Sequence, residues 1–315
     1  MSELRIKALS EQQTTMIHRA TLQVLATTGV KVCLPRAVEM LGSAGAYVAE
    51  DNRVCIPAEL VETALETVPK TQTIYNRKGQ PAIFLEGDRT QYGTGPTTPM
   101  VLDPFSGERR ESCHSDIEQA ARLCDALPNI DYVMSMGLSG GRDPRKHGMH
   151  PEITDRLDFL AMLRNTVKPI IFSAWSLKGL EDIHGIAAAV AGGEKALAAK
   201  PLAIHYSEPT SPLVHGATAV EKLLFCAEKR MPLLYMPGPL AGGTAPVTVA
   251  GQLVISNAEC LSGLVLHQLC TPGAPFIYGS GSNPMDMRTM LAAYCGPDAF
   301  QSNAAGKALA DYYGL

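Results

Sequence analysis

Aromatic side chains stand at the ends of the short apolar runs that this sequence is expected to fold as strands. Aromatic residues make up only 6% of the chain, and Trp175 is its one tryptophan. The face of such a ring attracts cations, including quaternary ammonium groups, by about 0.5–2 kcal/mol depending on desolvation. A ring at a strand end can equally be structural, because its body packs while its polar edge meets water. Both interpretations stay open for five residues: Tyr92, Trp175, Tyr206, Tyr235 and Tyr278.

Two ionisable residues lie at the end of one of these runs. His205 ends the run Pro201-Leu-Ala-Ile-His205, and Glu208 follows three residues later. We predict both as candidate catalytic residues, because Glu208 can balance a positive charge or handle a proton. A solvated loop carboxylate is the alternative for Glu208. A lone histidine in an apolar run is commonly a satisfied core residue, and that alternative stays open for His205.

A glycine-rich turn follows another run and precedes an expected helix. Residues 233–248 read LLYMPGPLAGGTAPVT, and proline and glycine dominate turns because of their backbone geometry. We predict that Thr244 caps the helix and that Pro246 lies in its first turn. Two backbone N–H groups would then be available to an anion or a lone pair. Gly242, Gly243 and Thr244 are therefore candidate binding residues, with a plain tight connection as the alternative.

The elements that must position these residues repeat along the chain. Four runs begin with a proline, which is tolerated at the first residue of a strand because no ladder donor is needed there. Successive prolines lie 32, 31 and 43 residues apart, which leaves room for a crossover helix each time. The runs are Pro169–Phe172, Pro201–His205, Pro232–Tyr235 and Pro275–Tyr278, and Thr90–Gly93 and Ile130–Met134 fit the same series.

Helical patterns separate these strands. Ser115 and Glu118 form a capping-box pattern at the start of one helix, and Gly192 is a stop signal for another. Alternating strands and helices, with runs buried on both faces, predict an α/β fold with a parallel sheet. We expect a TIM (β/α)8-type barrel of which about six βα units are present. The expected helices cover residues 115–127, 152–164, 180–190, 215–229, 247–269 and a stretch from Pro297.

The first ninety residues show a different, mixed pattern. We predict residues 1–90 as an N-terminal α+β cap and residues 91–315 as an incomplete barrel domain, because the chain ends where a seventh strand is expected. An open barrel leaves two sheet edges that must be covered or will associate, so a homo-oligomer is expected. The cap elements are helices at 11–28, after Pro35 and from Pro57 to Pro69, a strand at Arg53–Ile56 and a hairpin over 73–85.

Composition argues against several classes of function. A net charge of −4 and a pI near 6.1 provide no basic field for nucleic acid. The longest apolar run, 247–269, contains too many polar residues for a bilayer span, so no membrane partner is expected. No G-x-G-x-x-G follows the first strand, which disfavours dinucleotide binding. The eight cysteines form no C-x-x-C pair, and without a recognisable leader we predict reduced thiols in a cytoplasmic protein.

Metal binding finds little support in the sequence. Cys260, Cys270 and Cys295 could join a histidine around zinc, but buried free cysteine is the preferred interpretation. His147 and His150 are three residues apart in an expected loop, with no third ligand nearby. We therefore predict no metal site.

Several strings along the chain resemble the trimethylamine methyltransferase (MttB-like) family. Together they extend over essentially the whole chain and are specific, although each alone is weak. Asn257 and Glu259 fall inside an expected helix, where a structural polar network is the favoured interpretation. The strings are PLAGGTAPVT from Pro239, NAE from Asn257, GAPFIYG from Gly273, YGTG from Tyr92, LDP from Leu102, ARLCDALPNI from Ala121, LRNT from Leu163 and KP from Lys168.

Similarity to that family implies a TIM barrel that moves a methyl group from a trimethylamine- or betaine-type amine to the cob(I)alamin of a separate corrinoid protein. The chain itself would hold the cation in a dry pocket at the strand ends and carry no tightly bound cofactor. The aromatic set and residues 242–244 would line that pocket. The best-known members carry pyrrolysine, whose position would fall past Leu315. Two alternatives stay open: a barrel lyase or aldolase, and a truncated non-catalytic fragment that keeps a cation-binding or partner-binding surface.

Overall fold

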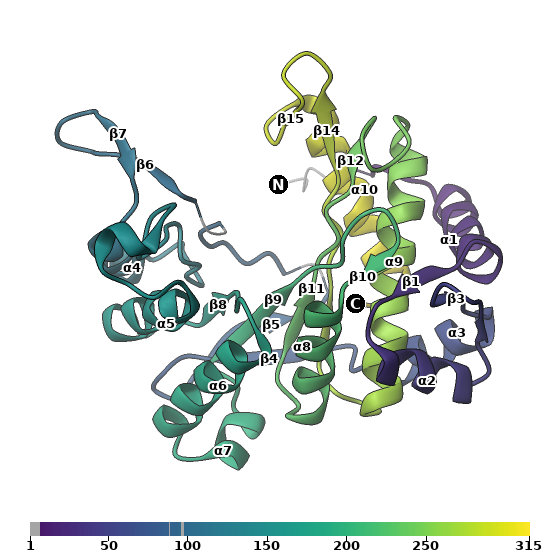
Figure 1. Ribbon diagram of the computed structural model, residues 1–315, viewed down its shortest axis with the longest axis horizontal. Helices are drawn as coiled ribbons and strands as arrows, with labels where there is room; N and C mark the ends of the chain where they lie inside the picture. Colours follow the sequence, from purple (N-terminus) through teal and green to yellow (C-terminus); the bar gives the residue numbers. More distant parts are fainter. Residues whose placement is uncertain (1–6, 88, 96–97) are drawn as a thin grey trace, which may run out of the picture. The chain divides into compact units, whose positions relative to one another are not determined.

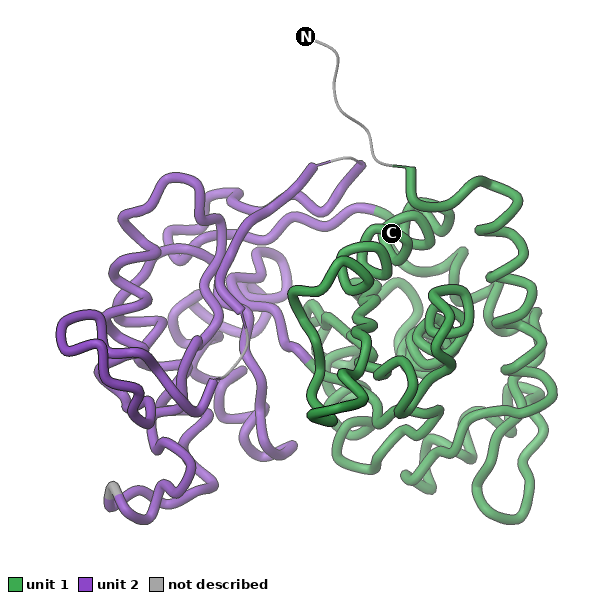
Figure 2. The backbone as a smooth tube through the Cα atoms, turned by 90° about the horizontal axis from the view of Figure 1, so that it is seen from above, with its two compact units in different colours: residues 1–70, 207–315 green, residues 71–206 purple. Residues whose placement is uncertain are grey.

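The chain divides into two units, which Figure 2 distinguishes by colour. The computed structural model describes residues 7–87, 89–95 and 98–315. Unit 1 combines residues 1–70 with 207–315, and unit 2 is formed by residues 71–206. The N-terminal segment therefore clusters with the C-terminal part of the chain. A domain boundary near residue 90 stays a prediction.

The N-terminal part of unit 1 is helical with one small sheet. Ser10 caps the first helix in a capping box, because its Oγ accepts from Gln13 N at 3.2 Å and Gln13 Oε1 accepts from Ser10 N at 2.8 Å. The sheet has the strand order β10-β1-β3-β2. The elements are α1 (Glu11–Thr27), β1 (Val30–Val32), α2 (Pro35–Ser43), β2 (Tyr47–Val48), β3 (Arg53–Cys55), α3 (Ala58–Thr67) and β10 (Val214–His215).

Helix α9 (Val249–Cys270) is the core helix of unit 1. Helices α1, α3, α8 (Ala217–Glu228) and α10 (Pro297–Tyr313) all pack against it (Figure 1). Within the described part of the chain it alone is long and apolar enough to cross a membrane, and 72% of its most apolar window is buried. Its apolar character is thus accounted for by packing inside unit 1.

Two strand groups complete unit 1. β11 (Leu233–Tyr235) and β13 (Phe276–Tyr278) pair in parallel, with Tyr235 opposite Tyr278. A second group has the order β12-β14-β15, and its antiparallel β14–β15 hairpin is at the top of Figure 1. Its strands are β12 (Leu240–Ala241), β14 (Asn283–Asp286) and β15 (Leu291–Ala292).

Unit 2 contains two hairpins and one parallel strand pair. β8 (Ile170–Phe172) and β9 (Ala203–Ser207) are parallel, with Phe172 opposite His205. The hairpins are β4 (Gln72–Tyr75) with β5 (Pro81–Leu85) and β6 (Met100–Leu102) with β7 (Arg109–Glu111). The helices are α4 (His114–Ala126), η1 (Pro144–His147), η2 (Pro151–Ile153), α5 (Thr154–Asn165), α6 (Leu177–Ala191) and α7 (Glu194–Ala199).

The α/β class is confirmed, and all four strands that follow a proline form. Each begins one or two residues after its proline, because the ring removes the N–H that a ladder would need. The predicted helices form within a few residues of their expected ends, and Gly192 ends α6 with a positive φ of 89°. Closure into a barrel stays a prediction.

The two less regular strands, 90–93 and 130–134, form only in part. A side chain takes a hydrogen-bonding position that a neighbouring strand would otherwise use: Asp131 Oδ2 accepts from Tyr92 N at 2.8 Å. What remains are isolated parallel bridges between Gly93 and Tyr132 and between Val133 and Ile170.

The capping box at the start of α4 uses different residues from those predicted. Cys113, not Ser115, is the N-cap, and the carboxylate of Asp116 accepts from Cys113 N at 2.9 Å. The same carboxylate pairs with Arg110 at 2.8 Å, which lowers the pKa of Asp116 to about 2. The contact with Arg110 favours Asp116 over Glu118 at this position, so the helix begins earlier than its sequence pattern suggests.

Candidate active site

Trp175 lies in the short connection between β8 and α6 of unit 2. Its backbone N–H donates to Asp155 Oδ2 at 2.9 Å, and its indole Nε1 donates to Thr154 Oγ1 at 3.0 Å. The residue nevertheless remains 48% exposed. The backbone N–H and the indole N–H of Trp175 are therefore both held while part of the residue stays accessible, which is compatible with a cation over the ring face.

The carboxylate that holds Trp175 is itself fixed by charge. The side chain of Asp155 is 0% exposed, and its Oδ1 accepts from Arg156 Nη1 at 2.9 Å. Arg156 also binds Asp182 Oδ2 through Nε at 3.0 Å. A buried charge is tolerable when it is paired and hydrogen-bonded, so this group forms a stable support at the start of α5.

A second buried carboxylate follows on α5. Asp158 Oδ1 accepts from Ser139 N at 2.8 Å, and Ser139 Oγ is 2.9 Å from His114 Nδ1. Burial raises the pKa of Asp158 to about 6. Sequence analysis did not single out Asp155 or Asp158, although their spacing of three residues places both on one helical face.

The other candidates in unit 2 differ in exposure. Tyr92 is 63% exposed, and Tyr206 is half-buried. His205 is 0% exposed; its Nδ1 lies 3.3 Å from the carbonyl oxygen of Phe172, and the two rings pack with centroids 5.3 Å apart. The structure thus places His205 in the core of unit 2, and a catalytic role for it stays a prediction.

Tyr235 of unit 1 is part of a buried hydrogen-bond chain. Its hydroxyl is 2.8 Å from His215 Nδ1, and His215 Nε2 is 2.8 Å from Ser262 Oγ. Ser262 donates its own hydrogen to Ala258 O at 2.7 Å, so Nε2–H donates to Ser262 and Nδ1 accepts from Tyr235. Burial lowers the pKa of His215 to about 4, which keeps the imidazole neutral. Tyr235 is 0% exposed.

Tyr278 belongs to a second buried network. Its hydroxyl donates to Asn257 Oδ1 at 2.8 Å, while Asn257 Nδ2 donates to Tyr313 OH at 2.8 Å and to Thr21 Oγ1 at 3.0 Å. Tyr313 OH in turn lies 2.9 Å from His18 Nδ1. Asn257 is thus the structural residue that its helical position predicted. The hydroxyl groups of Tyr235 and Tyr278 are both occupied inside unit 1, and substrate contact by either stays a prediction.

Glu208 follows β9 and is exposed, just before a tight turn. In that turn Thr210 and Val214 exchange backbone hydrogen bonds of 2.8 and 3.0 Å, and Leu213 has a positive φ of 60°. Glu259 of α9 holds the turn. Its Oε1 accepts from Leu213 N at 2.7 Å and its Oε2 from Ser211 Oγ at 2.8 Å, and burial raises its pKa to about 7.

The glycine-rich loop does not start the helix as predicted. Thr248, not Thr244, caps α9 by accepting from Gly251 N at 3.2 Å, and Pro246 precedes the helix. Thr244 Oγ1 instead accepts from Leu240 N at 2.9 Å. The N–H groups expected to bind an anion are used internally, because those of residues 243–245 donate to Leu240 O and that of Gly242 donates to Ala245 O. The predicted helix cap was therefore wrong, whereas substrate binding by Gly242, Gly243 and Thr244 stays a prediction.

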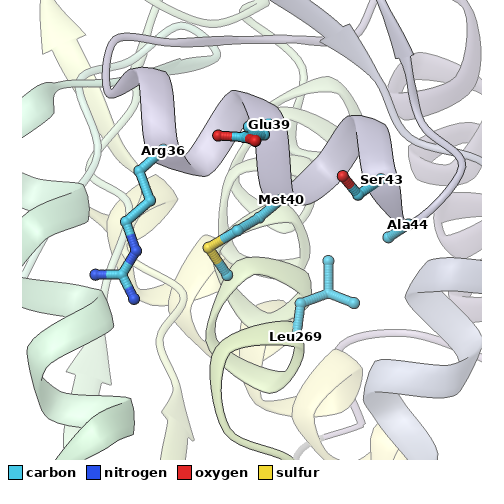
Figure 3. A pocket seen from close by; sticks show the side chains of 6 residues that line it. All are labelled: Arg36, Glu39, Met40, Ser43, Ala44 and Leu269. Carbon is cyan, nitrogen blue, oxygen red and sulfur yellow. The ribbon is translucent and has the colours of Figure 1, made fainter.

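A hollow of about 440 Å³ lies between α2 and the end of α9 in unit 1. Figure 3 shows Met40 and Leu269 facing it from the two helices, with Arg36 at one end. Arg36 is paired with Glu228 at 2.7 Å. None of its six lining residues is aromatic, so this hollow offers no ring face to an ammonium group.

Metal ligands do not gather in the described ranges. No three His, Cys, Asp or Glu side chains there form a metal-binding group, and the eight cysteines are free. Cys260 is buried and donates to Tyr235 O at 3.4 Å, whereas Cys295 is exposed.

Comparison with known proteins supplies the family. The family model described as "Trimethylamine methyltransferase (MTTB)" matches residues 2–315. The chain is 32% identical over 311 residues to trimethylamine methyltransferase MttB of Desulfitobacterium hafniense, covering 98% of this chain and 61% of that protein. It is 33% identical to MttB of Methanosarcina barkeri, covering 95% and 60%, and 29% identical to glycine betaine methyltransferase of D. hafniense, covering 98% and 62%.

Structural comparison agrees at the level of fold. A crystal structure of the hydroxylamine MtmB complex matches with a TM-score of 0.54 and 12% identity, covering 96% of this chain and 64% of that chain. The chain thus spans about three fifths of the length of the curated relatives it matches. On the sequence match over residues 2–315, this protein belongs to the trimethylamine methyltransferase family.

Proposed function

We propose that this protein acts as a methyltransferase that moves a methyl group from a methylated or quaternary amine to the cob(I)alamin of a separate corrinoid protein. Family membership supports methyl transfer, and relatives include proteins named for trimethylamine and for glycine betaine. The observation that carries the proposal is the half-exposed indole of Trp175, held through its Nε1–H by Thr154 while Asp155 holds the backbone N–H of the same residue.

The reaction needs little acid–base catalysis by the protein. The corrinoid, carried by its own protein, would supply the nucleophile and accept the methyl group, while the amine leaves with the electron pair of the broken C–N bond. This chain would hold the cation by ring faces and orient it. Glu208, exposed before a turn that Glu259 fixes, would balance the positive charge of the substrate. His205, buried in the middle of β9, is proposed as the second catalytic residue.

The fold and setting of the enzyme are part of the proposal. The parallel pairs β8–β9 and β11–β13 support a TIM (β/α)8-type barrel. The free cysteines support a cytoplasmic location. A homo-oligomer is also part of the proposal, because a sheet edge that is not covered tends to pair with another chain.

The test is methyl transfer by the 315-residue chain. Trimethylamine and glycine betaine are each mixed with the chain and free cob(I)alamin, with and without a corrinoid protein, and the visible band of methylcob(III)alamin is followed. Growth of that band with one amine supports the proposal and identifies the substrate class. Amine binding by calorimetry without any band would favour the non-catalytic alternative, and no binding would overturn the cation site as well.

A further inference from the structure

The indole of Trp175 is held by a hydroxyl whose direction is itself fixed. Thr154, the first residue of α5, is 4% exposed, and its Oγ1 donates to Pro151 O at 2.9 Å. Its only hydrogen is used in that bond, so Oγ1 faces Trp175 Nε1 as an acceptor at 3.0 Å. The ring is therefore held through its Nε1–H edge, while Trp175 remains 48% exposed.

The backbone on both sides of the indole is equally constrained. Asp155 Oδ2 accepts from Trp175 N, and Ser176 caps α6 by accepting from Gly179 N at 3.1 Å. Gly179 packs directly on the carboxylate, because a Cβ at this position would overlap Asp155 Oδ2. The connection that carries Trp175 is thus tied to the starts of two helices, α5 and α6.

We propose that Thr154 and Asp155 are positioning residues that fix the indole of Trp175 as a platform for a methylated ammonium cation. The inference rests on the proposed function and deepens it by assigning the platform and its supports. A fixed ring needs no ordering when the cation arrives, so its affinity is higher than that of a mobile ring. An ammonium group carrying methyl groups fits such a face because it binds without requiring hydrogen-bond acceptors.

Tryptophan fluorescence comes from Trp175 alone, because it is the one tryptophan of the chain. Tetramethylammonium is titrated into the purified chain while tryptophan emission is followed, and tert-butanol serves as a neutral probe of similar shape. We expect a saturable change in emission with tetramethylammonium and none with tert-butanol. Equal changes with both probes, or none with either, would overturn the cation platform.

The role of Thr154 is tested with shape-matched variants. Thr154→Val keeps the side-chain shape but accepts no hydrogen bond, so the ammonium dissociation constant should rise about 3- to 10-fold and the anisotropy of tryptophan emission should fall. Thr154→Ser should restore both. A valine variant with wild-type affinity and anisotropy would overturn the positioning role. If that variant does not fold, Gly179→Ala, which displaces Asp155, supplies the same comparison.

Methyl-transfer kinetics separate this inference from the proposed function. In the active enzyme Thr154→Val should raise KM for the amine and leave kcat nearly unchanged, because it weakens binding in ground state and transition state alike. A change in emission on ammonium binding without any methyl transfer would contradict the proposed function but support the cation platform. Methyl transfer with an unchanged KM in the valine variant would remove the platform alone.

Discussion

Trp175 of unit 2 and Tyr235 and Tyr278 of unit 1 all sit at or just after strands that follow a proline, yet they have different surroundings. The tryptophan is held through its edge and remains 48% exposed, whereas Tyr235 is 0% and Tyr278 9% exposed. The tyrosine hydroxyls bond to His215 and Asn257 inside unit 1. All three rings thus bond to buried partners, and they differ in how much of the side chain the surrounding residues cover.

Two buried carboxylates, one in each unit, differ in their hydrogen-bonding partners. Asp155, behind Trp175, is paired with Arg156 at 2.9 Å. Glu259, on the buried helix α9 of unit 1, accepts from the Ser211 hydroxyl and the Leu213 peptide N–H, and burial raises its pKa to about 7. The negative charge of Asp155 is thus balanced by the guanidinium of Arg156, whereas the carboxylate of Glu259 receives only neutral hydrogen-bond donors.

Glu259→Gln should produce the largest effect, and the effect should depend on pH. The folded pKa of about 7 lies above the ordinary 4.5, so the folded state binds more protons in that interval. The ionisation of Glu259 therefore lowers the free energy of unfolding as pH rises, by about 3 kcal/mol between pH 4.5 and 8. Gln cannot ionise, so its stability relative to wild type should be about that much higher at pH 8 than at pH 5.

Urea unfolding at pH 5 and pH 8 measures this difference. Glu66→Gln on the exposed side of α3 is the matched control in the same unit. If Glu259→Gln follows the same pH dependence as that control, the buried carboxylate does not titrate as proposed.

Gly263→Ala tests how tightly the tyrosine ring is enclosed. A Cβ at this position of α9 would overlap the ring of Tyr235, so we expect the free energy of unfolding to fall by about 1–3 kcal/mol. Gly185 lies at an exposed position of α6, where an added Cβ meets nothing within 4 Å, so Gly185→Ala should instead gain up to about 1 kcal/mol. Denaturant midpoints of both variants give the answer, and a neutral Gly263→Ala would show that the ring can move.

Tyr235→Phe removes only the hydroxyl of the enclosed ring. The variant should lose about 1 kcal/mol of unfolding free energy, because His215 Nδ1 no longer receives a hydrogen bond. Tyr278→Phe should lose a similar amount through Asn257 Oδ1. Thermal unfolding at constant pH is the measurement. Stability unchanged in both variants would mean that these networks do not hold the two rings.

Trp175→Phe should have the smallest effect on stability, below about 1 kcal/mol, because only one hydrogen bond of a half-exposed side chain is lost. Its effect should appear in ammonium binding, since phenyl is the weaker cation-binding face, and Trp175→Leu should bind more weakly still. Calorimetric titration with tetramethylammonium measures the dissociation constants of the wild type, of both Trp175 variants and of Tyr235→Phe. Weaker binding by Tyr235→Phe than by Trp175→Leu would reverse the comparison between the two units.

Local chemistry explains why much of the fold could be predicted. Proline before a β-rich run fixes where a strand can begin, and apolar spacing with Gly192 marks a helix and its end. The failures occurred where two local solutions compete. Thr244 and Thr248 are both good caps, but the pairing of β12 with β14 and the compact turn at Leu240 leave the role to Thr248.

The sequence by itself determined the α/β alternation, the family and the set of aromatic side chains at strand ends, because these depend on residue type and spacing along the chain. Only the tertiary structure decided which ring keeps an open face. That outcome depends on groups distant in sequence. Thr154 lies 21 residues before Trp175. In the hydrogen-bond network of Tyr235, Ser262 lies 47 residues after His215. Hydrogen bonds over such separations form only when packing brings their helices and strands together.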